Sequence, residues 1–133
     1  VICFSETRLG LMTDFGGGPA LTHLIGASRA ADLILTARKV GAEESFSFGL
    51  VNRISQPGKA LEEAREMARM IAQNGPRAVR HALEVLRCSQ NLPLNDALTL
   101  EAEKAVSLIT SGECLHGVAA FLEKKKPEFP DYE

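Results

Sequence analysis

The sequence predicts an α/β fold dominated by helices, and three observations support this prediction. Two short runs rich in strand-forming residues, "VICF" (1–4) and "LVNRI" (50–54), lie in the first half of the chain. Between them, segments that begin and end at glycine or proline carry apolar residues at helical spacing. After Pro57–Gly58 only the helical period remains. We therefore expect an α/β portion over residues 1–57 and a helical C-terminal region over residues 58–133.

Three helices are expected between the two predicted strands. In "GGGP" (16–19), Gly18 can act as the N-cap and Pro19 suits the first helical position, where its missing N–H has no cost. This helix should end at Gly26. Ser28 is then expected to cap a second helix through "RAADLILTA". A third, short helix is expected over 42–48.

Four helices are expected in the C-terminal region, each marked by one apolar face. The turn "NGP" (74–76) separates the first two, Pro93 lies near the start of the third, and "KKKP" (124–127) closes the fourth. The residues of the four faces are Leu61, Ala64, Ala68 and Ile71; Val79, Leu83 and Leu86; Leu94, Leu98, Ala102, Ala105 and Ile109; and Leu115, Val118, Ala119 and Leu122.

Composition excludes several classes of partner and location. The net charge of −2 leaves no basic surface for nucleic acid, so no nucleic-acid partner is expected. No apolar run approaches the ~18 residues that a membrane helix needs, and no secretory signal opens the chain. The 3 cysteines are odd in number and widely spaced, as in reduced intracellular proteins. We expect an intracellular protein of the cytoplasm or of the mitochondrial or peroxisomal matrix, not a secreted or membrane protein.

The start of the sequence suggests a longer polypeptide. The chain opens on Val1, a strand-forming residue, without an initiator Met. Two short strands alone are marginally stable in water. We therefore expect that upstream sequence supplies the rest of the sheet, as in a fragment, a processed product or one chain of a split enzyme.

The glycine cluster in "DFGGG" (14–18) has three interpretations. The triplet Asp-Phe-Gly occurs in protein kinases, but no HRD-type loop precedes it and no glycine-rich strand loop accompanies it. The dinucleotide pattern G-x-G-x-x-G is not met, because the three glycines are contiguous. A plain structural turn before a helix is the interpretation that the spacing favours.

Histidine spacing gives no metal or catalytic assignment. His23, His81 and His116 lie far apart, and each falls within a helical pattern, so the sequence predicts no metal site. The cations Lys124–Lys126 end a predicted helix, where positive charge is favourable.

Glu6 and Asp14 are the candidates for acid–base chemistry. Glu6 directly follows a predicted buried strand, where an unpaired carboxylate is costly unless it reaches a cleft. Asp14 precedes a predicted helix N-terminus, which stabilises a negative charge. Two carboxylates in different surroundings can divide acid and base roles. An extended path would separate them by ~26 Å, so only a chain reversal near Gly10 brings them together.

Four segments in order resemble the enoyl-CoA hydratase/isomerase (crotonase) family, and together they cover essentially the whole chain. The first is "FSETRLGLMTDFGGGPALTHLIG", which is similar to the family's Glu, Leu-Gly-Leu and glycine-rich turn. The second is "RAADLILTARKVGAEESFSFGLVNRI". The last two are "GPRAVRHALEVL" and "GVAAFLEKKKPEF", which resemble the family's final helices.

The resemblance implies the C-terminal half of a ClpP/crotonase-type ββα spiral, followed by helices, in a subunit of a homotrimer or hexamer. It implies an acyl-CoA substrate, with coenzyme A as part of the thioester and no separate cofactor. Glu6 matches one of the family's two catalytic acids, and Asp14 matches a functional Asp of several isomerases. The family's two oxyanion-hole donors and its other acid lie upstream of Val1, so this chain alone is expected to be inactive.

The glycine-rich turn departs from the pattern of the family that the chain resembles. In the resemblance, ordinary hydratases read "LIPGGGG" where this chain has "LMTDFGGG", so Thr13–Asp14 favours a double-bond isomerase or a specialised relative over a simple hydratase. Phe121 and Lys124 match a family motif that holds CoA from a neighbouring subunit, and their i, i+3 spacing predicts one helix face. A core Phe and a capping Lys explain the same residue types equally well. The alternative function is a non-catalytic helical oligomerisation or CoA-docking module.

Overall fold

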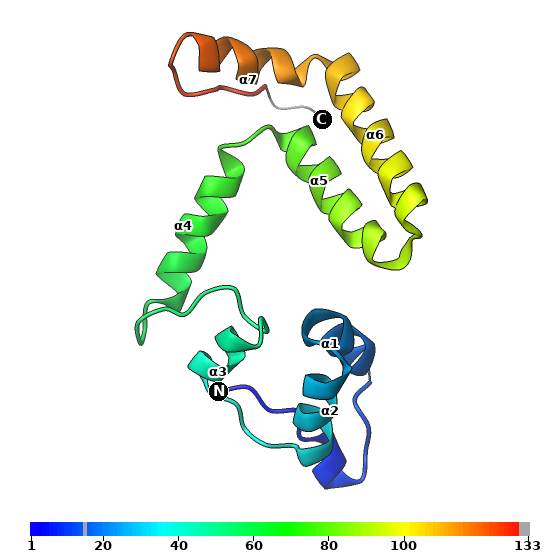
Figure 1. Cartoon of the computed structure of the whole chain (residues 1–133). Helices are drawn as coiled ribbons and strands as arrows, with labels where there is room; N and C mark the ends of the chain where they lie inside the picture. The colour runs from blue at the N-terminus through cyan, green and yellow to red at the C-terminus, as the bar shows by residue number, and fades with distance from the viewer. Residues whose placement is uncertain (15, 131–133) are drawn as a thin grey trace. The chain divides into compact units, whose positions relative to one another are not determined.

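The computed structural model describes residues 1–14 and 16–130, which form two compact units, Val1–Ala60 and Leu61–Glu133. Figure 1 shows the elements of both. The N-terminal unit contains the 3₁₀ helix η1 (Glu6–Leu9) and the helices α1 (Gly17–Ile25), α2 (Ala27–Thr36) and α3 (Ala42–Ser47). The C-terminal unit contains α4 (Ala60–Ala72), α5 (Pro76–Cys88), the 3₁₀ helix η2 (Ser89–Asn91), α6 (Leu94–Ser111) and α7 (Glu113–Leu122).

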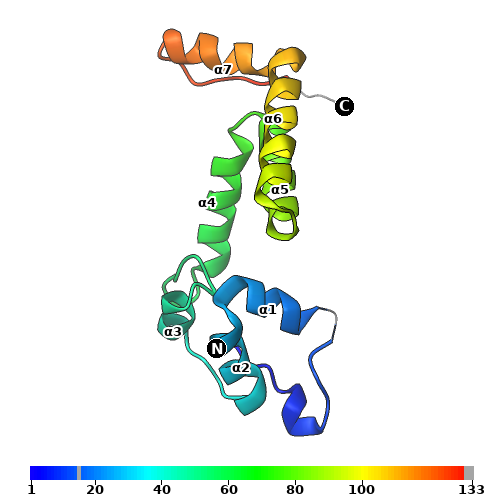
Figure 2. The ribbon, with the colours of Figure 1, turned by 45° about the vertical axis from the view of Figure 1, so that its right-hand side comes forward.

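The core of the N-terminal unit lies between α1 and α2, which lie side by side (Figures 1 and 2). Apolar residues recur along both helices so that one face of each is buried against the other. Phe48 packs at the edge of this core, with the Arg29 guanidinium 5.0 Å from its ring centre. The buried core residues are Leu21, Ile25, Ala30, Leu33 and Val40.

Neither predicted strand forms, so both strand predictions are wrong. Within the described residues there is no strand, and residues 50–54 are irregular. Residues 1–4 contribute one isolated antiparallel bridge, in which the N–H of Ile2 and of Val40 each donates to the other's carbonyl at 2.9 Å. A strand needs a neighbour for its backbone groups, and the described residues offer Ile2 a single bridging partner. The helix-dominated part of the fold prediction is confirmed.

The starts of α1 and α2 each lie two residues before the predicted positions. Helix α1 begins at Gly17, with Gly16 as its N-cap in the left-handed region (φ 85°), so Pro19 lies two residues into the helix. Its missing N–H still has no cost there, because the first four N–H groups of a helix lack intrahelical partners. Gly26 caps α2, and Ser28 does not. A single glycine therefore ends one helix and starts the next.

Arg38 ties α2 to α3 through two carboxylates. Its guanidinium donates to Asp32 on α2 at 2.6 Å and to Glu44 on α3 at 2.7 Å. The hydrogen bond from Arg38, supported by its charge, lowers the pKa of Glu44 below its ordinary value of 4.5. The bonds to Glu44 and Asp32 raise the pKa of Arg38 further above its already high ordinary value. Arg38 thus fixes the short helix α3 against the core.

We predict that this ion pair makes stability depend on acid pH. Because the folded-state pKa of Glu44 is lowered, its stabilising contribution is present above pH 4.5 and is lost as pH falls through the lower folded-state value. Denaturant unfolding followed at several pH values below 5 should show a smaller loss of stability for Glu44→Gln than for the unsubstituted protein. An equal loss in both proteins would contradict the prediction.

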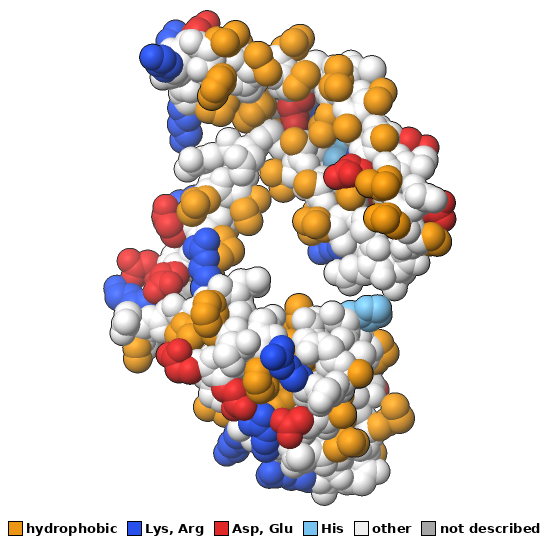
Figure 3. All heavy atoms as spheres, in the orientation of Figure 1, with side chains coloured by type: hydrophobic (Ala, Val, Ile, Leu, Met, Phe, Trp, Pro, Cys, Tyr) orange, Lys and Arg blue, Asp and Glu red, His pale blue; other side chains and the backbone are white. Residues whose placement is uncertain are grey.

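The four helices of the C-terminal unit form as predicted, but their apolar faces are largely exposed. Helices α5 and α6 lie side by side in an antiparallel hairpin (Figure 1). Figure 3 shows hydrophobic side chains across the visible surface of this unit. A helix face of this kind requires a partner surface. The exposed large apolar residues of the unit are Leu61, Met70, Ile71, Leu83, Leu86, Leu92, Leu94, Leu98, Val106, Ile109, Leu115, Val118, Phe121 and Leu122.

A buried carboxylate ties the start of α7 to the start of α5. Glu113, the first residue of α7, is 2 % exposed and accepts hydrogen bonds from the N–H groups of Arg77 and Ala78 at 3.0 and 2.8 Å. These N–H groups belong to the first turn of α5, where no intrahelical partner exists and a negative charge is favourable. Gly75, the N-cap of α5, is buried beside the carboxylate. Glu113 therefore caps a helix that begins 37 residues before it in the sequence.

Candidate active site

Glu6 is the first residue of η1, which the surrounding chain holds in place. The Thr7 hydroxyl donates to the carbonyl of Ile34 on α2 at 2.8 Å, which fixes η1 against the core. Gly10 follows η1 with φ 72°, a left-handed conformation that glycine adopts without strain. The N–H of Leu11 donates to the carbonyl of Glu6 at 3.0 Å, so the chain reverses here. This is the turn that the sequence requires near Gly10 if Glu6 and Asp14 are to converge.

The Glu6 carboxyl has an oxygen that is buried but unpaired. Its Oε2 atom is inaccessible to solvent and has no hydrogen-bond partner among the described residues. Buried polar atoms in folded proteins nearly always have a partner, so each exception needs an explanation. No described residue uses the hydrogen-bonding capacity of this oxygen, which marks Glu6 as the candidate for proton transfer.

Asp14 lies in the turn before α1. Its carbonyl accepts the N–H of Gly17 at 3.0 Å, and its side chain is exposed. Thr13 is buried beneath the first turn, where its hydroxyl oxygen lies 3.3 Å from the position of a Cβ added to Gly18. The glycines therefore let this turn pass close to Thr13, as the structural-turn interpretation requires. The convergence of the Glu6 and Asp14 carboxylates stays a prediction.

Phe121 and Lys124 do not share a helix face, so that prediction is wrong. Helix α7 ends at Leu122, and Lys124 lies beyond it in the left-handed region with φ 55°. Its N–H still donates to the carbonyl of Phe121 at 3.1 Å, which keeps the two residues adjacent. Phe121 is 81 % exposed, so its ring is free to contact a ligand and is not a core residue of this unit.

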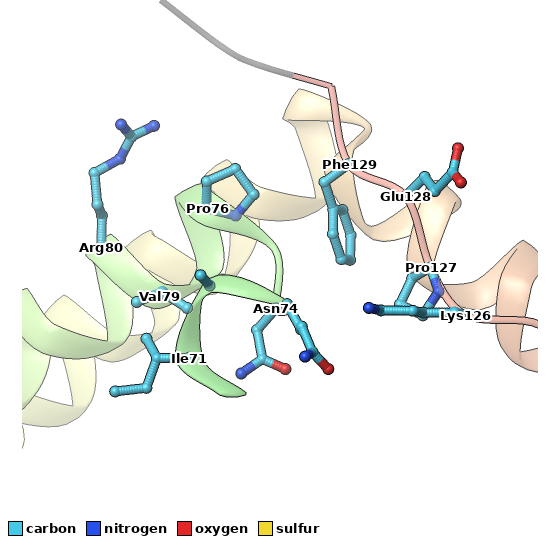
Figure 4. A pocket seen from close by; sticks show the side chains of 11 residues that line it. Ile71, Asn74, Pro76, Val79, Arg80, Lys126, Pro127, Glu128 and Phe129 are labelled. Carbon is cyan, nitrogen blue, oxygen red and sulfur yellow. The ribbon is translucent and has the colours of Figure 1, made fainter. Parts of the chain in front are cut away.

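The C-terminal unit also contains a cavity of about 600 Å³ between the α4–α5 turn and the residues after α7. Figure 4 shows the Phe129 ring directed into it and the Lys126 side chain extending toward Asn74. Sequence reasoning missed Glu113 and Phe129. An acidic residue at the start of a helix was the available signal for Glu113, whereas nothing local marks Phe129.

The described residues hold neither a cluster of metal-ligating side chains nor a single helix that could span a membrane. Among residues 1–14 and 16–130, no group of three or more His, Cys, Asp or Glu side chains is placed to hold a metal ion. Over the same residues no single helix has the length and apolar composition to cross a membrane. The pair α6 and α7, bent by 73°, meets those criteria only when taken together.

Comparison with known proteins identifies the family. A sequence model described as enoyl-CoA hydratase/isomerase matches residues 1–132. The chain belongs to the enoyl-CoA hydratase/isomerase family. Among individual relatives, the short-chain-enoyl-CoA hydratase of Clostridium acetobutylicum is 32% identical over 123 residues, which are 92% of this chain and 47% of that protein. The carnitinyl-CoA dehydratase of Salmonella arizonae is 30% identical over 128 residues, 93% of this chain and 49% of that one.

Solved structures agree with this membership of the enoyl-CoA hydratase/isomerase family. The crystal structure of enoyl-CoA hydratase from Bacillus anthracis matches with a TM-score of 0.91 at 36% identity, covering 94% of this chain and 48% of that one. An enoyl-CoA hydratase structure from Geobacillus kaustophilus gives a TM-score of 0.88 at 35% identity, with 95% and 49% coverage. The chain therefore spans about half the length of the relatives it matches, and the match is consistent with the C-terminal half of a crotonase-type fold.

Proposed function

We propose that the whole protein to which this chain belongs hydrates or isomerises enoyl-CoA thioesters. The observation that supports this most directly is the buried, unpaired Oε2 of Glu6, on a residue that matches a catalytic acid of the family. Relatives of this chain are named as a short-chain-enoyl-CoA hydratase and a carnitinyl-CoA dehydratase.

In this proposal Glu6 transfers a proton at carbon α or β of the thioester. In hydration, the oxygen of water bonds to carbon β and a proton is added at carbon α, so that no other reactant is consumed. The enolate that forms is stabilised by two backbone N–H groups, which in our proposal come from the half of the protein outside this chain. Acting alone, this chain would lack that stabilisation, and we expect it to show no hydration.

Asp14 is proposed as a second acid or base, which a double-bond shift requires because one proton is removed and another is added. Its side chain is exposed in the turn that leads into α1. Phe121 and Lys124 are proposed to hold the nucleotide end of CoA bound by a neighbouring subunit in a homotrimer or hexamer. The exposed apolar faces of α6 and α7 support such an assembly.

An assay of the whole protein with two substrates tests the role of Asp14. We expect Asp14→Asn to lower turnover of a 3-enoyl- or dienoyl-CoA by about 10²-fold or more, the usual effect of losing an acid–base group. Hydration of a 2-enoyl-CoA should fall less. Both rates are measured by absorbance of the conjugated thioester. Equal effects on the two reactions, or none, would remove Asp14 from the site.

A non-catalytic role in oligomerisation or CoA docking is the second candidate function. The exposed apolar residues of the C-terminal unit favour it, because they require a partner surface whether or not chemistry occurs. A whole protein that binds CoA or assembles but turns over neither class of enoyl-CoA would support this function over catalysis.

A further inference from the structure

The residues that follow α7 fold back along that helix as a strap, defined here as residues 123–130 (Figures 1 and 2). The reversal occurs at Lys124, which has φ 55°. The N–H of Lys125 donates to the carbonyl of Ala120 at 2.9 Å, which closes the turn. The N–H of Lys124 also donates to the carbonyl of Phe121 at 3.1 Å, so the two bonds together form a left-handed cap of the kind that ends many helices.

Phe129 anchors the far end of the strap in a notch between two glycines. A Cβ added to Gly75 would lie 3.4 Å from Cε1 of the Phe129 ring, and one added to Gly117 would lie 3.7 Å from its Cζ. The ring therefore packs closely against the backbone at both glycines. Phe129 also lines a cavity of about 160 Å³ beside the notch, together with Leu108 and Cys114.

The notch itself is held by Glu113. Its carboxylate accepts the N–H groups of Arg77 and Ala78, so the first turn of α5 and the N-cap Gly75 are fixed to the start of α7. The strap is therefore pinned at two places. One is the left-handed turn at Lys124, and the other is the aromatic ring five residues later.

We propose that Phe129 is a positioning residue for CoA binding, which it serves by fixing the strap that continues from the turn at Lys124. This inference rests on the proposed function, in which the Lys124 ammonium meets a phosphate of the nucleotide. Phe129 touches no reacting atom. Its removal frees the strap, so the chain around Lys124 is held only by the turn itself and the ammonium is no longer kept beside the phosphate.

Calorimetric titration of the whole protein with CoA, and separately with pantetheine, which lacks the nucleotide, tests the proposal. We expect Phe129→Ala to weaken CoA binding by about tenfold, the loss of one hydrogen bond to a charged group. Pantetheine binding should be unchanged. Phe129→Leu, which refills much of the notch, should restore most of the affinity. Phe46→Ala is the matched control, because it truncates an exposed Phe of the N-terminal unit.

A double-mutant cycle shows whether Phe129 acts through Lys124. Lys124→Gln removes the ammonium, so adding Phe129→Ala to it should weaken CoA binding little further, whereas independent effects would add. Additive losses, or equal losses for CoA and pantetheine, would overturn the positioning role.

Trypsin cleavage provides a readout of the strap that does not depend on CoA. We expect Phe129→Ala to speed cleavage after Lys124 and Lys125 by about tenfold, because local opening exposes the strap. If the unsubstituted protein binds no CoA, the proposed function and the role of Phe129 in CoA binding both fail. Unchanged cleavage in a protein that does bind CoA would overturn the anchor alone.

Discussion

Replacing Glu6 by Gln in the whole protein is expected to lower kcat for a 2-enoyl-CoA by about 10²–10⁴-fold, the usual contribution of a general acid or base. Gln has nearly the shape of Glu, so the fold and the substrate contacts should persist. It cannot exchange a proton at the position of Oε2, which the structure leaves buried and unpaired. KM should change little, because the lost interaction belongs to the proton transfer.

Steady-state kinetics with the conjugated-thioester absorbance measure this effect. Glu103→Gln is the matched control, since Glu103 lies on an exposed face of α6 and should leave turnover unchanged. Thermal unfolding of both variants separates a chemical effect from a loss of fold. A Glu6→Gln protein that turns over within twofold of the unsubstituted enzyme would show that Glu6 has no catalytic role.

The substitution Gly75→Ala is expected to lower the free energy of unfolding of the C-terminal unit. The added Cβ would lie 2.6 Å from Oε1 of Glu113, closer than real Cβ contacts come, and 3.1 Å from its Cδ, which is tighter than most. Glu113 is buried and holds two N–H groups of α5, so it cannot move aside without breaking those bonds. Leaving such donors unpaired costs about 1–3 kcal/mol.

Thermal or denaturant unfolding of the whole protein tests this prediction, with Gly117→Ala as a matched control. A Cβ at Gly117 would make only ordinary contacts with Phe129, at 3.7 and 3.8 Å. Because Gly117 lies within α7, Ala there should be neutral or stabilise by up to about 1 kcal/mol. If both variants lose the same stability, the contact between Gly75 and Glu113 is not what holds the unit together.

The helices of the C-terminal unit could be predicted from sequence because their signals are local. Pro76 is the first residue of α5 and Pro93 is the N-cap of α6, close to where the turn signals place them. The predicted strands failed because strand formation depends on a neighbour. Residues 1–4 and 50–54 have suitable composition, but composition does not supply a partner.

In the candidate site, too, the residue with a local signal could be predicted and the residues that depend on distant contacts could not. Glu6 could be singled out because a carboxylate beside an apolar run is costly, and the structure places its Oε2 in an unpaired, buried position. The roles of Glu113 and Phe129 depend on contacts with Gly75 and with the first turn of α5, 35 or more positions earlier in the chain. No local pattern reports a contact of that kind. The left-handed turn at Lys124 was missed for a related reason, since helical spacing predicts that α7 continues through it.

The central claim is that Glu6 and Asp14 act together on a thioester. A crystal structure of the whole protein with an unreactive acyl-CoA analogue tests it most directly. The account predicts the Glu6 carboxyl oxygen at roughly 3–3.5 Å from carbon α or β of the acyl group, with Asp14 facing the same cleft. Carboxylates that point away from each other and from the thioester would contradict it.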